Sequence, residues 1–180
     1  MENCSTKSER KVLIIGYGNS LRGDDAVGPF VASHLGGFAV HQLTPELAEN
    51  LAMADHAVFI DARQDLAPGA VDIRPLSGGA VMTHYCTPEY LLQLAREVYG
   101  RAPNSVLVGI GADSFELGAP LSPAVLQAAR EIETDLSAVL SAYNNEEIAT
   151  LDVFEELHPQ AQAPEDWWTA EFKARLPGFY

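Results

Sequence analysis

The chain has 180 residues, of which 47% are hydrophobic, and its formal net charge is −14. This length and apolar content are sufficient for one domain with a substantial core. The negative charge argues against nucleic acid and anionic lipid as partners, because both bind to basic surfaces.

The sequence carries no recognisable targeting signal. No stretch approaches the roughly 20 apolar residues of a membrane span, and the polar opening MENCSTKSERK lacks the apolar core of a secretory signal. The two cysteines, Cys4 and Cys86, are too few for a disulfide framework. We therefore expect a cytoplasmic, monomeric protein without a membrane partner and without disulfides.

Strand and helix patterns alternate along residues 11–143. Continuous apolar, β-branched runs predict strands at 11–16, 38–43, 57–60, 71–76 and 105–111. Helical spacing of apolar residues predicts helices at 26–35, 45–54, 88–99 and 122–143. This alternation is typical of βαβ units. It predicts a three-layer α/β fold, with a twisted, mainly parallel sheet of about five strands and helices on both faces.

The two ends of the chain differ in character from this domain. Residues 1–10 are predicted to be a disordered leader, and residues 144–180 a polar linker followed by a short helix. Trp168, Phe172 and Leu176 are spaced as one apolar stripe of that helix. The stripe could pack back on the domain or bind a partner, and the sequence assigns it no role.

Three polar residues follow predicted strands at the places where ligands bind in open parallel sheets. Asp25 ends a glycine-rich turn after the first strand, Asp61 follows the third strand, and His84 lies in the loop after the fourth. We expect all three at one edge of the sheet. Two carboxylates and an imidazole suit a borderline divalent ion such as nickel, zinc or cobalt, and three ligands leave room for water or substrate.

Each candidate has a simpler alternative. Asp25 could cap the helix that follows it. Asp24 could be a turn residue, and His84 a surface histidine. Cys86 could approach the same metal or be a small buried thiol, whereas His41 is expected to be incidental.

The glycine-rich turn also has to be weighed as a dinucleotide site. Gly16 and Gly18 match the first two glycines of a GxGxxG motif, but Leu21 stands where the third is required. The pair Asp24 and Asp25 would repel a pyrophosphate. The sequence therefore disfavours nucleotide binding.

Over about residues 11–140, the sequence resembles the hydrogenase maturation protease family. The resemblance is carried by Gly16-Tyr-Gly-Asn-Ser-Leu-Arg-Gly-Asp24-Asp25-Ala-Val-Gly28, then Ile60-Asp61-Ala62, Thr83-His84 and Val108-Gly-Ile110. It implies an α/β domain in which two carboxylates and a histidine contact metal. Motif matching places these ligands on Asp25, Asp61 and His84.

The resemblance also implies a reaction. Such proteases are aspartyl-type, metal-dependent endopeptidases that recognise nickel in the precursor of a nickel–iron hydrogenase large subunit. They cleave after the basic residue that follows its C-terminal cysteine motif. The nickel is therefore expected to be carried by the substrate, although zinc or cadmium could occupy the site in vitro. Asp24 is a candidate to orient the attacking water, or else a structural neighbour.

Two points stay open at this stage. A non-catalytic, nickel-handling hydrogenase assembly protein could use the same three ligands without hydrolysis. Many family members also carry an acidic-Gly-Gly segment where this chain has residues 41–46. This departure leaves open which hydrogenase the protein serves.

Overall fold

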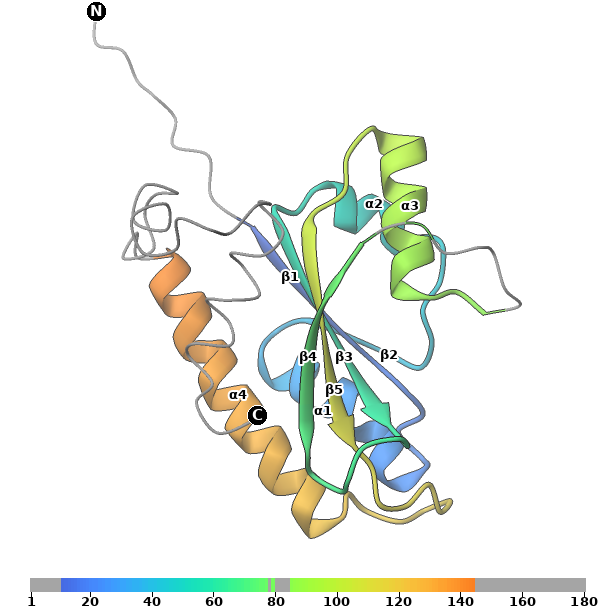
Figure 1. Ribbon diagram of the computed structural model, residues 1–180, viewed down its shortest axis with the longest axis vertical. Coiled ribbons are helices and arrows are strands. Elements are labelled where there is room, and N and C mark those ends of the chain that lie inside the picture. Colours follow the sequence, from blue (N-terminus) through green and yellow to red (C-terminus); the bar gives the residue numbers. More distant parts are fainter. Residues whose placement is uncertain (1–10, 78, 80–84, 145–180) are drawn as a thin grey trace, which may run out of the picture.

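Five strands form one sheet in the computed structural model, which describes residues 11–77, 79 and 85–144 (Figure 1). In the order β2-β1-β3-β5-β4, the first four strands are parallel and β4 runs antiparallel to β5. The strands are β1 (Val12–Tyr17), β2 (Phe38–Val40), β3 (His56–Arg63), β4 (Val71–Leu76) and β5 (Asn104–Gly111). The predicted α/β fold with a mainly parallel sheet is confirmed.

Helices cover both faces of the sheet. Helices α1 and α4 lie on one face and α2 and α3 on the other (Figure 1). Their bounds are α1 (Val27–His34), preceded by a 3-10 turn η1 (Gly23–Ala26), α2 (Leu47–Ala52), α3 (Pro88–Tyr99) and α4 (Pro123–Asn144). None of the helices in the described segments is both long and apolar enough to span a membrane.

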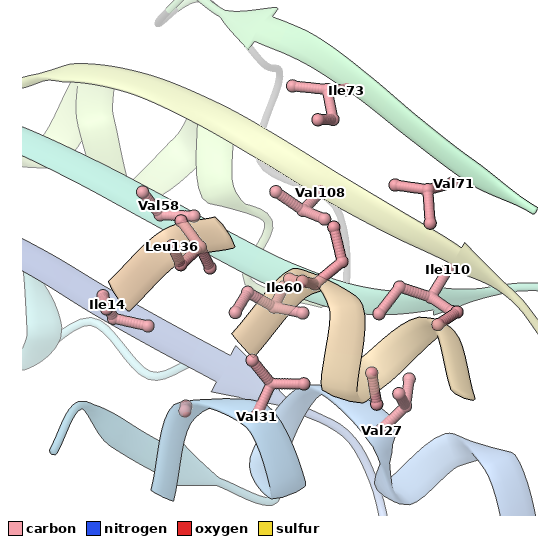
Figure 2. Close-up of a cluster of buried hydrophobic side chains, with 14 of the residues drawn as sticks. Ile14, Val27, Val31, Val58, Ile60, Val71, Ile73, Val108, Ile110 and Leu136 are labelled. Atoms are coloured by element: carbon pink, nitrogen blue, oxygen red, sulfur yellow. The ribbon is translucent and has the colours of Figure 1, made fainter. Parts of the chain in front are cut away.

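The apolar strand residues pack into two cores, one on each side of the sheet. On one side, Val27 and Val31 of α1 and Leu136 of α4 pack against Ile60 of β3 and its neighbours (Figure 2). On the other side, Phe59 is fully buried against residues of α2 and α3. Each fully buried aliphatic side chain contributes about 1.5–3 kcal/mol. Burial on both faces explains why the central strands are continuous apolar runs.

Two glycines allow α1 to rest directly on the strand backbones. A Cβ atom at Gly28 would overlap the carbonyl oxygens of Ile60 and Tyr17, and one at Gly16 would overlap the carbonyl oxygen of Gly28. The first turn of α1 therefore touches the ends of β1 and β3. This close approach brings Asp25, two residues before α1, to the same edge of the sheet.

Replacing Gly28 with alanine is expected to lower the free energy of unfolding by at least about 3 kcal/mol, because the new methyl group meets backbone that cannot move aside. Urea unfolding measures the loss. Gly36→Ala is the matched control, since nothing lies within 4 Å of its new Cβ and only the positive φ of 70° is strained. That change should cost about 1–2 kcal/mol. Equal losses in the two variants would contradict the close-packing explanation.

Several predicted boundaries differ from the structure. The second strand ends at Val40 instead of residue 43, because β2 is an edge strand paired only with β1. Helix α2 starts at Leu47 instead of Pro45, after a turn closed by Leu47 N–H donating to the Thr44 carbonyl. The third strand continues to Arg63, because its pairing with β5 extends to Gly111.

The predicted leader covers residues 1–10, and the predicted linker and C-terminal helix cover residues 144–180. The linker does not begin at residue 144, because Asn144 is the last residue of α4. Residues 1–10 and 145–180 lie outside the described part of the chain. Their assignments stay predictions.

Candidate active site

A cavity of about 550 Å³ opens at the carboxyl ends of β1 and β3, on the side of the sheet that carries α2 and α3. Asp25 and Asp61 both line it, as the strand-end rule predicts. The remaining lining residues come from the end of β1 and the turn after it, from the segment after β2, and from the segment before α3 and its first turn: Tyr17, Gly18, His41, Gln42, Leu43, Thr44, Pro45, Tyr85, Cys86 and Tyr90.

Asp25 is held by the turn that precedes it in the chain. Its Oδ2 accepts a hydrogen bond from the backbone N–H of Asn19 at 2.9 Å. Gly18 makes this turn possible, because its φ is +141° and any Cβ there would overlap the carbonyl oxygen of Asp25. Helix α1 has Ala26 at its N-cap, without a side-chain cap bond. The alternative that Asp25 caps this helix is therefore wrong.

Asp61 lies within β3, beside Tyr17 at the end of β1. Its carboxylate interacts with the Tyr17 hydroxyl and with the backbone of Ala62. Burial raises the pKa of Asp61 to about 6, and the negative charge of Asp25 adds to the rise, whereas the interactions with Tyr17 and Ala62 oppose it. The two cavity carboxylates therefore repel each other, and a bound cation would relieve this repulsion.

Tyr17 is a site residue to which the sequence analysis gives no role. It is partly buried, and burial followed by the charge of Asp61 raises the pKa of its phenol well above the ordinary value. The hydroxyl therefore stays protonated and remains a donor. The alternation of Leu13, Ile15 and Tyr17 on one face of β1 is the signal that could have directed attention to it.

Asp24 is fully buried and does not line the cavity. Its Oδ2 accepts from the N–H groups of Asp113 and Ser114, at 2.8 and 3.0 Å, and its Oδ1 accepts from that of Ser122 at 2.6 Å. Burial acts to raise the pKa of Asp24, but these backbone donors outweigh it and hold the pKa below its usual range. The structure therefore favours the structural alternative for Asp24 over a role in orienting water.

His84 lies outside the described residues, so its role as a ligand stays a prediction. The sequence predicts the His84 loop beside Asp25 and Asp61, because the loop follows the carboxyl end of a strand that is expected to be parallel. That reason is wrong, because β4 is antiparallel and its last residue, Leu76, pairs with Ser105 near the start of β5. The loop therefore begins at the opposite edge of the sheet. Tyr85 and Cys86, which directly follow His84 in the chain, nevertheless line the cavity.

Two further residues of the cavity concern the sequence predictions. His41 lines the cavity, and the expectation that it is incidental stays a prediction. Cys86 lines it as well, and burial, followed by the charge of Glu46, raises the pKa of its thiol. A protonated thiol is a poor metal ligand.

The described residues do not complete a metal site by themselves. Across residues 11–77, 79 and 85–144, no three His, Cys, Asp or Glu side chains are grouped closely enough to hold a metal ion. Carboxylate oxygens nevertheless fit a divalent cation, and Asp25 and Asp61 present two of them in one cavity. They can supply part of a ligand set that another residue or a substrate would complete.

No protein-family profile and no curated protein matches the chain. Solved structures do match. The [NiFe] hydrogenase maturation protease HycI from Thermococcus kodakarensis KOD1 is 24% identical, with a TM-score of 0.60 over 75% of this chain and 95% of that one. The hydrogenase maturating endopeptidase HybD from E. coli is 25% identical, with a TM-score of 0.57 over 73% of this chain and 92% of that one.

The chain has the fold of the hydrogenase maturation proteases. The hydrogenase 2 maturation peptidase from a Thaumarchaeota archaeon shares this fold at a TM-score of 0.53 and 23% identity, over 73% of this chain and 99% of that one. The family resemblance seen in the motifs is thereby confirmed by the structure comparison. In this maturation protease fold, the matched motifs place Asp25 and Asp61 in one cavity.

Proposed function

We propose that the protein is an endopeptidase that removes the C-terminal extension from the precursor of a nickel–iron hydrogenase large subunit after nickel insertion. The observation that carries this proposal is the pairing of Asp25 and Asp61 in one cavity at the strand ends of a maturation protease fold. The solved proteins that share the fold are described as hydrogenase maturation proteases and endopeptidases. The motif resemblance supports the same reaction.

In the proposed mechanism, the nickel belongs to the substrate. Asp25 and Asp61 contact the nickel of the precursor, with His84 as the predicted third ligand, and so hold the scissile peptide bond at the cavity. A divalent ion in this position polarises the scissile carbonyl or a bound water. The hydrogen bond from Asn19 to Asp25 and the Tyr17 hydroxyl beside Asp61 hold the two carboxylates in place before the precursor arrives.

The segment 41–45 forms one wall of the same cavity. This is the region in which the chain departs from the acidic-Gly-Gly pattern of many family members. Because the wall borders the two carboxylates, it is suited to contact precursor residues next to the metal. We therefore assign to it the choice among hydrogenase precursors.

Incubation with nickel-loaded precursor is expected to shorten the large subunit, as seen by intact mass, whereas nickel-free precursor stays uncut. The reason is that the polarising charge arrives only with the metal. Equal cleavage of both precursors would contradict the substrate-borne metal. A stable complex without a change in mass would indicate the non-catalytic assembly protein instead, and cleavage of casein would indicate a general peptidase.

The pH dependence of kcat/KM is expected to follow Asp61. Its pKa is about 6, so lowering the pH through 6 protonates the carboxylate and removes the charge that binds the cation. Between pH 7 and pH 5 the ionised fraction, and with it kcat/KM, should fall about tenfold. Circular dichroism at each pH controls for unfolding. A flat profile down to pH 5 would show that ionised Asp61 is not required.

A further inference from the structure

The sheet sets Tyr17 beside Asp61 on one flank and Gly109 on the other. Strands β1 and β3 are adjacent and parallel, and Gly16 pairs with Ile60, so Tyr17 and Asp61 follow next to each other on the same face. On the β5 side, Asp61 pairs with Gly109, and the side chain of Arg63 lies over that glycine. Of the two neighbouring strands, only β1 therefore places a side chain, that of Tyr17, directly beside this carboxylate.

Two neutral groups interact with the Asp61 carboxylate. They are the Tyr17 hydroxyl and the backbone of Ala62. Arg63, the nearest cation along the strand, is engaged with Asp65 through hydrogen bonds from its Nε and its NH2 group, and it also pairs with Asp72. Asp61 thus keeps its negative charge available to the cavity, and the Tyr17 hydroxyl is the neutral side-chain group that interacts with it.

The ring and the hydroxyl of Tyr17 have different tasks. The ring packs against the core on the side of α2 and α3, where phenylalanine would serve equally well. The hydroxyl is the part that reaches Asp61. Outer groups that orient a metal ligand in this way typically change activity or metal affinity 10–100-fold when they are removed.

We propose that Tyr17 is a positioning residue, whose hydroxyl fixes the Asp61 carboxylate in the orientation that meets the metal of the precursor. This inference rests on the proposed function. The hydroxyl donates to the carboxylate and does not itself touch the substrate. The aromatic residue that opens the glycine-rich turn therefore belongs to the site as well as to the core.

The test is Tyr17→Phe, which removes the hydroxyl and keeps the ring. With nickel-loaded precursor, kcat/KM is expected to fall 10–100-fold. The affinity for nickel-free precursor, measured by calorimetry, should stay within twofold, because the hydroxyl acts only through the metal ligand. Tyr99→Phe is the matched control, since Tyr99 is exposed at the end of α3 and does not line the cavity. It should change neither quantity.

The outcomes separate this inference from the proposed function. If wild-type protein cleaves nickel-loaded precursor and Tyr17→Phe matches it within twofold, the positioning role is wrong while the proposed function stands. If the variant loses affinity for nickel-free precursor in parallel with kcat/KM, or melts well below Tyr99→Phe, Tyr17 is structural and the inference is overturned. If wild-type protein does not cleave at all, the proposed function fails and the positioning role fails with it.

Discussion

Replacing Asp61 with asparagine is expected to abolish processing of the precursor and, at neutral pH, to make the protein more stable. Asparagine is uncharged, so it removes one of the two negative charges that line the cavity. Without that charge the cation is held poorly and the scissile bond is not positioned. We expect kcat/KM to fall about 100- to 1,000-fold, as when other groups that stabilise charge in a transition state are removed.

The gain in stability follows from the direction of the pKa shift. The pKa of Asp61 rises from 3.8 to about 6 on folding, so the fold favours the protonated form. The stability contributed by that form is complete below the unfolded pKa near 4 and is lost as the pH rises through 6. At pH 7 the ionised carboxylate therefore costs about 1–3 kcal/mol, and asparagine avoids this cost. The Tyr17 hydroxyl keeps an acceptor in the asparagine carbonyl.

Urea unfolding at two pH values tests this prediction. Asp61→Asn should be more stable than wild type by about 1–3 kcal/mol at pH 7 and nearly equal to it at pH 4. Glu116→Gln is the control, because Glu116 is an exposed carboxylate in the loop after β5 and should alter neither stability nor processing. A variant that loses activity together with stability at pH 7 would show that Asp61 serves the fold instead of the reaction.

The central strands and α3 could be predicted because their own residues decide them. Both faces of β1, β3 and β5 are covered, so their apolar runs identify them without further information. Helix α3 begins where Thr87 accepts a hydrogen bond from the Tyr90 N–H and ends at Gly100, whose φ is +78°. Caps of this kind can be predicted from the residues next to the helix ends.

The direction of β4 and the end of β2 do not follow from the apolar patterns of these two strands. A run of alternating residues does not reveal whether a strand is parallel, but the short connection 64–70 does, because a parallel crossover needs a dozen or more residues. Strand β2 has one neighbour, so nothing extends it beyond Val40. Residues 41–45, which follow the end of β2, form a wall of the cavity. No periodic pattern in the sequence predicts this wall.

The residues of the candidate site also differ in whether the sequence predicts their roles. Asp25 and Asp61 are predictable because the carboxyl ends of parallel strands meet at one edge. The role of Tyr17 depends on β1 and β3 being neighbours, and the role of Asp24 depends on a loop almost 90 residues further along the chain. Neither fact is contained in the local sequence. The Gly-Asp-Asp turn therefore combines one carboxylate for the cavity with another for the fold.

Replacing Asp24 with alanine is expected to destabilise the protein by at least about 4 kcal/mol. The change leaves the N–H groups of Asp113, Ser114 and Ser122 without their acceptor next to a buried position. Each unsatisfied buried donor costs about 1–3 kcal/mol, and water entering the space recovers part of that. Asp24→Asn keeps one carbonyl oxygen but turns an NH2 group towards backbone donors, so it should cost about 2–3 kcal/mol.

The pH dependence distinguishes this structural role from a catalytic one. Because folding lowers the pKa of Asp24, its contribution is present above the unfolded pKa near 3.9 and is lost as the pH falls below it. The stability difference between wild type and Asp24→Asn, measured by urea unfolding, should therefore shrink below pH 4. Processing should fall only in step with the folded fraction, since Asp24 does not line the cavity. An Asp24→Asn protein that is as stable as wild type but does not cleave the precursor would instead make Asp24 the residue that orients the attacking water.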